Sequence, residues 1–238
     1  PPDYTIEEEY IENYINKLYI SLLGIEPGEN DFNDAKNILN NNGCSEQDRI
    51  TLIENIMNNN LYAYHMFRLN REDYLNGVDT FEIRNQIENW ENIIENEILG
   101  NNDTILIILY QQVLDKLINL QNSPSEYLNS SINTIEIHKR CFYNIIYDDI
   151  NMGTEIFVVS IFQNLFHRYP TNAELSLSSN MVDGNQSNIF NQNGNSKKDF
   201  LDIVFNSNNY YEGQVKRLYN KYLFRDPTSK EMSNLSIL

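Results

Sequence analysis

Glycine, proline and cysteine are scarce in this chain of 238 residues. Nine glycines and six prolines leave few points at which helices must end, so long irregular loops are not expected. The two cysteines, Cys44 and Cys141, form neither a CxxC pair nor a zinc-binding framework. Buried free thiols are therefore expected in preference to a disulfide. No apolar run approaches the roughly 18 residues that a membrane-spanning helix needs.

Positive charge is also in short supply. Seventeen Lys and Arg against 34 Asp and Glu give a formal net charge of −17. Such a field repels nucleic acid and anionic lipid, so we expect no nucleic-acid partner. Solubility is the plain interpretation of this charge, and attraction to a basic partner surface is the sharper one. Hydrophobic residues make up 41% of the chain, which is enough to form a core in one domain or two small ones.

The common catalytic and cofactor-binding motifs are absent. The chain contains no HExxH, GxSxG, P-loop or GxGxxG pattern. The histidines, His65, His138 and His167, have no convincing ligand partner at helical spacing, so we expect no metal site, no cofactor and no catalytic residue. Asp148 and Asp149 are adjacent at a predicted helix end. They could bind a cation, although solvated acids are the commoner arrangement there.

A stretch that occurs three times is the feature around which the chain is organised. Each copy has an apolar residue, an aromatic residue, an apolar pair, a short turn and a proline. The copies are Leu18–Phe32, Ile161–Leu175 and Leu218–Met232, which align on Pro27, Pro170 and Pro227. The apolar spacing predicts one face of a helix. The proline then suits the first turn of the next helix.

The helix after the proline carries an N-terminal capping box in the second and third copies. Thr171 precedes Glu174 by three residues, and Thr228 precedes Glu231 by the same spacing. In the first copy Gly28 replaces the threonine, so this cap is not expected there.

The apolar periodicity predicts helices along the whole chain. They cover Tyr4–Leu23 with Thr5 as cap, Asp31–Asn40, a Ser45-capped helix to Met57, Thr80–Leu99, Asp103–Asn122, Glu126–Tyr147 as one helix or two, Glu155–Phe166, Asn172–Val182, a Ser196-capped helix to Phe205, and Gln214–Phe224. Pro124 is expected to end the fifth of these, with Ser123 or Ser125 as the next cap. Asp183–Asn195 is a predicted polar loop. No stretch alternates with period two, so strand content should be near zero.

These helices predict an all-α fold of about nine to eleven helices, built from an internal repeat of about fifty residues. Residues 1–70 form the first repeat unit, and residues 71–151 a central helical segment. Residues 152–212 form the second unit, and residues 213–238 begin a third unit that is cut short.

The repeated order resembles a known pattern. It reads LYxxLLxRxPxxxE, a helix, a glycine-containing loop, then a capped helix that ends in an Asn/Ser-rich turn before a tyrosine. It is similar to the helical repeat of an uncharacterised bacterial family with an LYxxLLGRxPD-type motif, and more distantly to the helical linker domains of phycobilisomes. The matches span residues 18–62, 161–211 and 218–232, less than half of the chain. Ile25 stands in place of the arginine in the first copy.

The resemblance implies a helical module of extracytoplasmic or assembly proteins and supplies no catalytic residue. Because phycobilisome linkers are basic and this chain is acidic, pigment binding is not implied. A bacterial cell-envelope setting, periplasmic or at the outer membrane, follows as an expectation, in a secretion, surface-motility or uptake machine. The start at Pro1 would be explained by a removed lipoprotein leader, with a lipid anchor upstream of residue 1, or equally by a trimmed end.

The leading prediction for function is a non-enzymatic scaffold or adaptor that docks with other protein subunits. The candidate contact residues are Arg168, Arg225, Tyr62, Tyr210 and Tyr211. The competing interpretation of Arg168 and Arg225 is that they bond helix-end carbonyls or pair with Glu174 and Glu231. The tyrosines could equally join one repeat to the next.

Two other functions are open. A glycan- or ligand-binding surface lipoprotein would stack Trp90 and the tyrosines on sugars, although Trp90 at helical spacing with Ile87 and Ile94 is more typical of a core residue. A hydrolase with its site in the central segment would have to use Asp148, Asp149 and His138.

Overall fold

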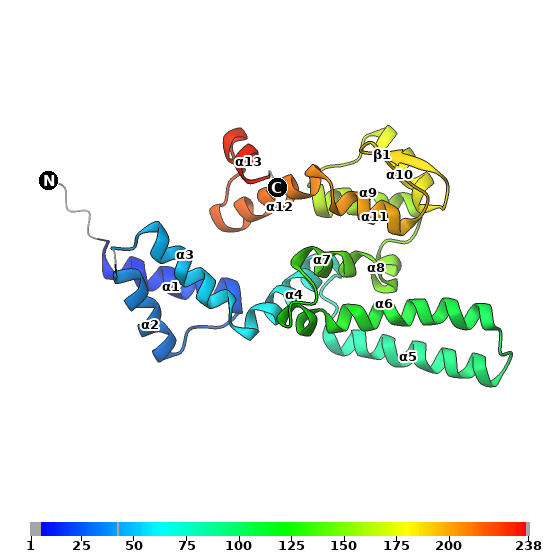
Figure 1. Ribbon diagram of the computed structural model, residues 1–238, viewed down its shortest axis with the longest axis horizontal. Coiled ribbons are helices and arrows are strands. Elements are labelled where there is room, and N and C mark those ends of the chain that lie inside the picture. Colours follow the sequence, from blue (N-terminus) through cyan, green and yellow to red (C-terminus); the bar gives the residue numbers. More distant parts are fainter. Residues whose placement is uncertain (1–5, 42, 237–238) are drawn as a thin grey trace.

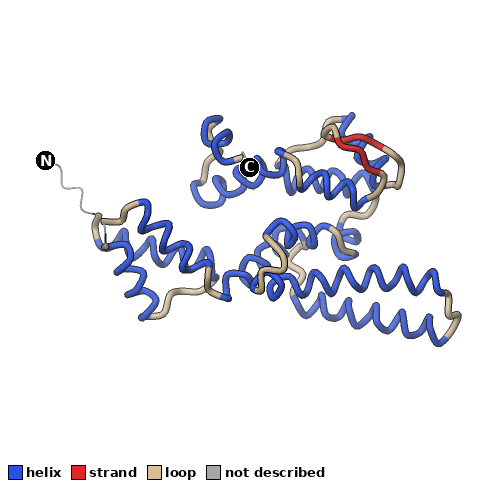
Figure 2. Tube along the Cα trace, viewed as in Figure 1, coloured by secondary structure: helices blue, strands red, loops and turns tan. Residues whose placement is uncertain are grey.

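The computed structural model describes residues 6–41 and 43–236, and this part of the chain is almost entirely helical (Figures 1 and 2). Its elements are α1 (Glu8–Leu23), α2 (Glu29–Asn40), α3 (Glu46–Met57), α4 (Asn60–Tyr74), α5 (Thr80–Leu99), α6 (Thr104–Leu128), α7 (Thr134–Phe142), α8 (Ile145–Ile150), α9 (Thr154–Phe166), α10 (Asn172–Val182), β1 (Ser187–Ile189), β2 (Gln192–Gly194), α11 (Lys197–Phe205), α12 (Asn208–Leu223) and α13 (Ser229–Leu235). The all-α class is confirmed. The described residues hold thirteen helices, more than the predicted nine to eleven.

Two of the differences between the predicted and the observed helices arise at the Asn/Ser-rich turns, which were predicted only to end helices. Each of these turns also caps the next helix. The side chain of Asn59 accepts from the backbone N–H of Leu61, and Ser207 accepts from that of Tyr210. Helix α4 therefore follows α3 directly, and α12 begins well before the predicted start at Gln214. At the other end of the chain, α1 begins at Glu8, and Thr5, its predicted cap, lies outside the described residues.

The predicted break at Pro124 is also wrong, because α6 continues through it to Leu128. The hydroxyls of Ser123 and Ser125 donate back to the carbonyls of Asn119 and Asn122, at 3.0 and 2.8 Å, so neither serine caps a new helix. Burial of the proline ring offsets the hydrogen bond that its nitrogen cannot make. The predicted helix over 126–147 is therefore the end of α6 followed by α7 and α8.

The predicted polar loop over 183–195 contains a small antiparallel hairpin of β1 and β2, in which Ser187 pairs with Gly194 and Ile189 with Gln192. Phe190 and Asn191 between the strands both have positive φ, at 50° and 62°, as a type I′ turn requires. Phe190 packs on Phe166 of α9. Strands of three residues are too short to show an alternating pattern in the sequence.

The helices follow the same order twice. In the first copy α1 packs against α2, α3 and α4, and in the second copy α9 packs against α10 and α12. The β hairpin is inserted between α10 and α11, where the sequence of the second copy is longer. Helix α12 has two roles, because it ends the second copy and its last turns begin the third. Helix α13, the counterpart of α2 and α10, packs on α12.

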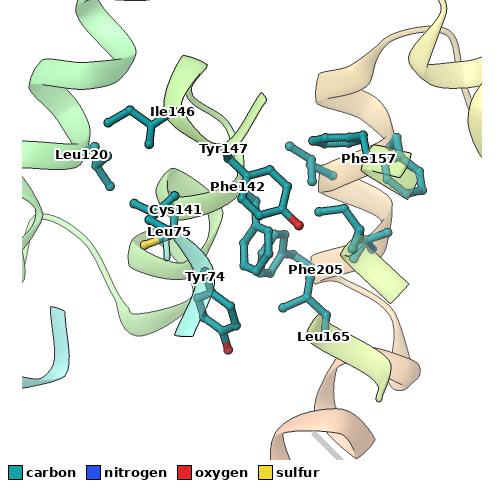
Figure 3. Packing of buried hydrophobic residues seen from close by; sticks show 14 of the residues in the cluster. Tyr74, Leu75, Leu120, Cys141, Phe142, Ile146, Tyr147, Phe157, Leu165 and Phe205 are labelled. Carbon is teal, nitrogen blue, oxygen red and sulfur yellow. The ribbon is translucent and has the colours of Figure 1, made fainter. Parts of the chain in front are cut away.

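The apolar interior forms two separate clusters. The first belongs to the first copy and contains Ile11, Ile15, Leu23, Ala35, Leu39, Cys44, Leu52 and Ile56. The second joins the central segment to the second copy: Tyr74, Cys141 and Phe142 face Phe157, Leu165 and Phe205 across it (Figure 3). The boundary placed at residue 151 therefore falls inside one core, and the boundary at residue 70 falls inside α4. Both cysteines are buried free thiols, as predicted.

Helices α5 and α6 form a long hairpin that projects from the centre of the molecule, away from the first copy and from α12 and α13 (Figure 1). The two helices pack mainly on each other along their length. Their far end, around the connection between Leu99 and Thr104, is the most distant part of the hairpin from the core (Figure 2).

Candidate docking surfaces

The first helix of each motif ends in a residue with left-handed backbone conformation. These residues are Gly24, His167 and Phe224, with φ of 75°, 53° and 53°. They align in the three copies, so the turn has the same geometry although only the first copy uses glycine, which adopts this conformation without strain. The turn therefore directs the chain toward Pro27, Pro170 or Pro227 in the same way each time.

The two arginines of the motif bind glutamates of their own turns. Arg168 donates to both carboxylate oxygens of Glu174, at 2.9 and 2.7 Å, and Arg225 donates to both oxygens of Glu231, at 2.8 and 2.6 Å. Both glutamates also complete the capping boxes begun by Thr171 and Thr228. The hydrogen bonds from Arg168 lower the pKa of Glu174 to about 2. The arginines thus clamp the turn, as the competing interpretation of the sequence held.

In the first and second copies, a glycine and a histidine meet where the first and last helices cross. The glycine is on the turn in the first copy and on the last helix in the second, and the histidine takes the other position each time. In the first copy Gly24 on the turn faces His65 of α4, and a Cβ at Gly24 would lie 2.4 Å from the imidazole Nδ1. In the second copy His167 on the turn interacts with the backbone of Gly213 in α12. A Cβ at Gly213 would lie 1.8 Å from the carbonyl oxygen of Leu165, so the backbones touch here. Burial lowers the pKa of both histidines.

The apolar face of the third copy is open. In the second copy Ile161 and Leu165 are fully buried, whereas their counterparts Leu218 and Tyr222 are 53% and 43% exposed. Phe224 is 88% exposed. Helix α13 packs beside this part of α12, and Arg217 contacts Asp73 and Tyr74 at the end of α4. None of the described helices takes the place that α11 and α12 have in the second copy. We call the exposed residues Leu218, Tyr222, Leu223, Phe224 and Leu235 the third-copy face.

The segment that carries this face is rich in basic residues, in a chain whose net charge is −17. Residues 216–230 contain five Lys and Arg and one acidic residue. Arg217 pairs with Asp73, and Arg225 pairs with Glu231. Lys216, Lys221 and Lys230 are the other three basic residues of this segment, and Lys221 interacts electrostatically with Asp73 and Glu72 of α4.

A second exposed apolar surface lies at the far end of the α5–α6 hairpin. We call it the hairpin tip, formed by Ile98, Leu99, Ile105, Ile108 and Leu109. Leu99 is 77% exposed. Residues 85–115 carry six acidic side chains and no Lys or Arg, so the tip is apolar and negatively charged. Contiguous exposed apolar residues of this kind mark interaction sites more often than chance exposure does.

The predicted tyrosine contacts have three different environments. Tyr210 is buried, and its hydroxyl lies 2.8 Å from Nδ1 of His138, so it packs within the chain instead of offering a contact surface. Tyr211 is half-buried beside Tyr210. Tyr62 is half-buried against Tyr127 of α6, and burial raises its pKa to about 12. Tyr62 and Tyr210 join α4 and α12 to the central segment, so neither contacts the next repeat directly as the second interpretation of the sequence held.

The residues proposed for a hydrolase make separate contacts. His138 is buried against Tyr74 and Tyr210, and burial lowers its pKa to about 3, so it is neutral at physiological pH. Asp148 pairs with Lys197, and Asp149 is exposed. A buried, neutral histidine bonded to a tyrosine has no access to a substrate, so this arrangement supports no hydrolytic role for His138.

Trp90 does not present a free stacking surface. It is half-buried in the hairpin and packs against Tyr110, with ring centroids 5.6 Å apart. This contact favours the core interpretation of Trp90.

A hollow of about 230 Å³ lies where α6, α7 and α11 meet. Lys139 and Lys198 both pair with Asp202 at its edge, at 2.5 and 2.7 Å. Arg140 bonds Glu126 at 2.7 Å and donates to the carbonyl of Asn119 at 2.7 Å. The Lys139–Asp202 pair joins the central segment to the second copy, and the bonds of Arg140 join α7 to α6.

Among the described residues, no group of three or more His, Cys, Asp and Glu side chains is placed to hold a metal ion. None of the described helices is both long and apolar enough to cross a membrane. Comparisons with protein-family models, with curated proteins and with solved structures find no match to this chain.

Proposed function

We propose that this protein is a non-catalytic helical scaffold or adaptor, which docks another protein on the third-copy face. The observation that carries the proposal is the contrast between copies: positions that are fully buried in the second copy, such as Ile161 and Leu165, are about half exposed in the third. An apolar helix face that other helices bury in one copy and that is exposed in another copy of the described structure is a candidate surface for a protein partner.

The chemistry of the face defines the partner. Leu218, Tyr222 and Phe224 provide apolar and aromatic anchors of the kind that dominate binding energy at interfaces. Lys216 and Lys230, on the same segment, favour a partner with acidic residues beside its apolar surface. The resemblance of the repeat adds an assembly of the bacterial cell envelope as the proposed setting.

The test is capture from the source organism by the tagged chain in mild detergent, followed by mass spectrometry. The third-copy face is altered by Leu223→Ser with Phe224→Asn, since asparagine tolerates the left-handed backbone of Phe224. Phe81→Ser, at an exposed position in the first turn of α5, is the matched control.

We expect a stoichiometric protein set with the wild type and with the control, and its loss with the face variant. Capture of the same set by all three proteins would refute docking on this face. Recovery of the wild type with nothing bound, including no second copy, would refute the scaffold function itself.

A further inference from the structure

One side of helix α6 is buried near the core and exposed near the connection to α5. Asn119 lies eleven residues, or about three turns, beyond Ile108, and Ser123 lies eighteen residues, or about five turns, beyond Ile105. These residues therefore share one side of the helix. Ser123 is fully buried, whereas Ile105 and Ile108 are 71% and 53% exposed. We call Ile105, Ile108 and Leu109, the exposed apolar residues at the outer end of this side, the outer stripe.

Helix α7 shows what kind of segment covers this side of α6 near the core. The two helices pack on each other, and Ile137 of α7 is fully buried. Arg140 of α7 donates to the carbonyl of Asn119 at 2.7 Å and lies 3.5 Å from the hydroxyl of Ser123. It also donates to the carboxylate of Glu126 at 2.7 Å. The cover is thus an amphipathic helix that buries its apolar residues and bonds α6 through a basic side chain.

The connection beside the outer stripe is fixed by hydrogen bonds. The carboxylate of Glu97 accepts from the backbone N–H of Asp103 at 3.2 Å, and the carbonyl of Glu97 accepts from the N–H of Asn102 at 2.6 Å. The carboxylate of Asp103 accepts from the N–H groups of Ile105 and Leu106, at 2.9 and 3.2 Å. A surface held in this way loses little conformational entropy when a partner binds.

The charge around the outer stripe selects the partner. Residues 85–115 contain six acidic side chains and no Lys or Arg. Glu91 and Glu95 are exposed and have no hydrogen bond or ion pair within the described part of the chain. Glu97, Asp103 and Asp115 bond backbone N–H groups and side-chain amides, which leave their negative charge without a counter-charge. This field favours Lys and Arg, and it opposes nucleic acid, anionic lipid and the same stripe of a second copy.

We propose that the outer stripe binds a basic amphipathic helix of another protein, which continues along α6 the cover that α7 provides near the core. Its apolar residues pack on Ile105, Ile108 and Leu109, and its Lys and Arg side chains face the acids of the hairpin. Lys116, whose ammonium lies 3.8 Å from the ring centroid of Tyr143, marks the inner limit of the site. It lies about 16 Å along the helix from Ile105, so the site holds about three turns of the partner helix.

The outer stripe and the third-copy face are separate docking sites. The α5–α6 hairpin projects away from α12 and α13 (Figure 1). The two surfaces also differ in charge, since the hairpin segment has no Lys or Arg and residues 216–230 have five. An adaptor of this form joins two different partners, and the inference about the outer stripe does not depend on docking at the third-copy face.

Binding of two labelled synthetic peptides to the purified full chain, measured by fluorescence anisotropy at about 0.15 M salt, tests the inference. Each peptide has about fourteen residues with leucine at i, i+3, i+4 and i+7, and the other positions are lysine in one peptide and glutamate in the other. The stripe variant is Ile105→Ser with Ile108→Ser. Its matched control is Phe81→Ser, because Phe81 is exposed and, like Ile105, is the second residue after an aspartate cap.

A second pair of variants tests the charge. Glu95→Gln with Asp115→Asn removes two acids from the hairpin. Glu26→Gln with Glu54→Gln removes the same charge at exposed positions of the first copy. Circular dichroism and urea unfolding check that every variant is folded.

We expect the wild type to bind the lysine peptide with a dissociation constant on the order of tens of micromolar and not to bind the glutamate peptide. The stripe variant should bind at least about tenfold more weakly and the hairpin charge variant about threefold more weakly, with both controls unchanged. No binding by the wild type, equal binding of the two peptides, or a stripe variant that binds as the wild type does would overturn the inference.

The third-copy face variant, Leu223→Ser with Phe224→Asn, should bind the lysine peptide as the wild type does. Loss of binding in this variant, with the stripe variant unaffected, would also overturn the inference. Capture of a native protein through the third-copy face is a separate measurement, so the proposed function stands or falls without this result.

Discussion

Replacing Gly213 by alanine should destabilise the protein, although glycine-to-alanine changes inside helices usually stabilise by about 1 kcal/mol. A Cβ at this position would lie 1.8 Å from the carbonyl oxygen of Leu165 and 2.9 Å from its carbon. A normal contact between carbon and oxygen is about 3.3 Å, so α12 would have to move about 1.5 Å away from α9. Overpacking of this kind costs about 1–3 kcal/mol, and two backbones cannot adjust as a flexible side chain would.

Urea unfolding followed by circular dichroism measures this effect, with an expected loss of about 2 kcal/mol in unfolding free energy for Gly213→Ala. Glu212→Ala is the matched control, because it adds an alanine to the same helix on an exposed position and should change stability by less than about 0.5 kcal/mol. A Gly213→Ala protein as stable as the wild type would show that α9 and α12 do not touch at this crossing.

Three further results are expected. Acidification from pH 7 to pH 5 should lower the unfolding free energy by about 2 kcal/mol through His138. Its folded pKa is about 3, so over this range only the unfolded state binds a proton there. In urea unfolding, His138→Gln should lose about 2 kcal/mol less than the wild type on the same acidification. Glu174→Gln should lower the melting temperature at pH 7 by a few degrees. In thermal melts this difference should shrink as the pH falls from 4.5 toward 2, because the wild-type Glu174 has a folded pKa of about 2 and loses its stabilising charge over this range. Cys141, buried and with its pKa raised to about 12, should react with a thiol reagent at pH 8 only as fast as the protein opens, and immediate labelling would contradict its burial.

The local features of the fold are readable from the sequence. The capping boxes at Thr171 and Thr228, the cap at Ser45 and the end of α1 at Gly24 depend on residues a few positions apart, and all four are present as predicted. The apolar period of 3.6 likewise predicts Thr80–Leu99 and Asn172–Val182 to the residue. Such features need no knowledge of distant contacts.

The remaining features depend on residues far apart in the chain. Pro124 stays within α6, where its ring is fully enclosed by neighbouring parts of the chain. Tyr210 is a buried residue because it meets His138, 72 positions earlier. A sequence pattern contains no signal for such meetings, so the break at Pro124 and a contact surface at Tyr210 were both predicted wrongly.

The docking surfaces were missed for the same reason. Leu218 and Ile161 occupy one motif position and look alike in the sequence, and only the absence of covering helices in the described structure makes Leu218 exposed. Two signals could have drawn attention to these surfaces. Residues 85–115 lack any Lys or Arg, and residues 216–230 gather five.

Photo-crosslinking from position 224 tests the central claim most directly. A photoreactive phenylalanine analogue replaces Phe224 in the chain expressed in its source organism, and the same analogue at Phe81 is the control. Docking on the third-copy face predicts one discrete adduct from position 224 that is absent from position 81, and peptide mapping identifies the partner and the segment that it contributes. No adduct from position 224, or the same adducts from both positions, would contradict a docking role for the third-copy face.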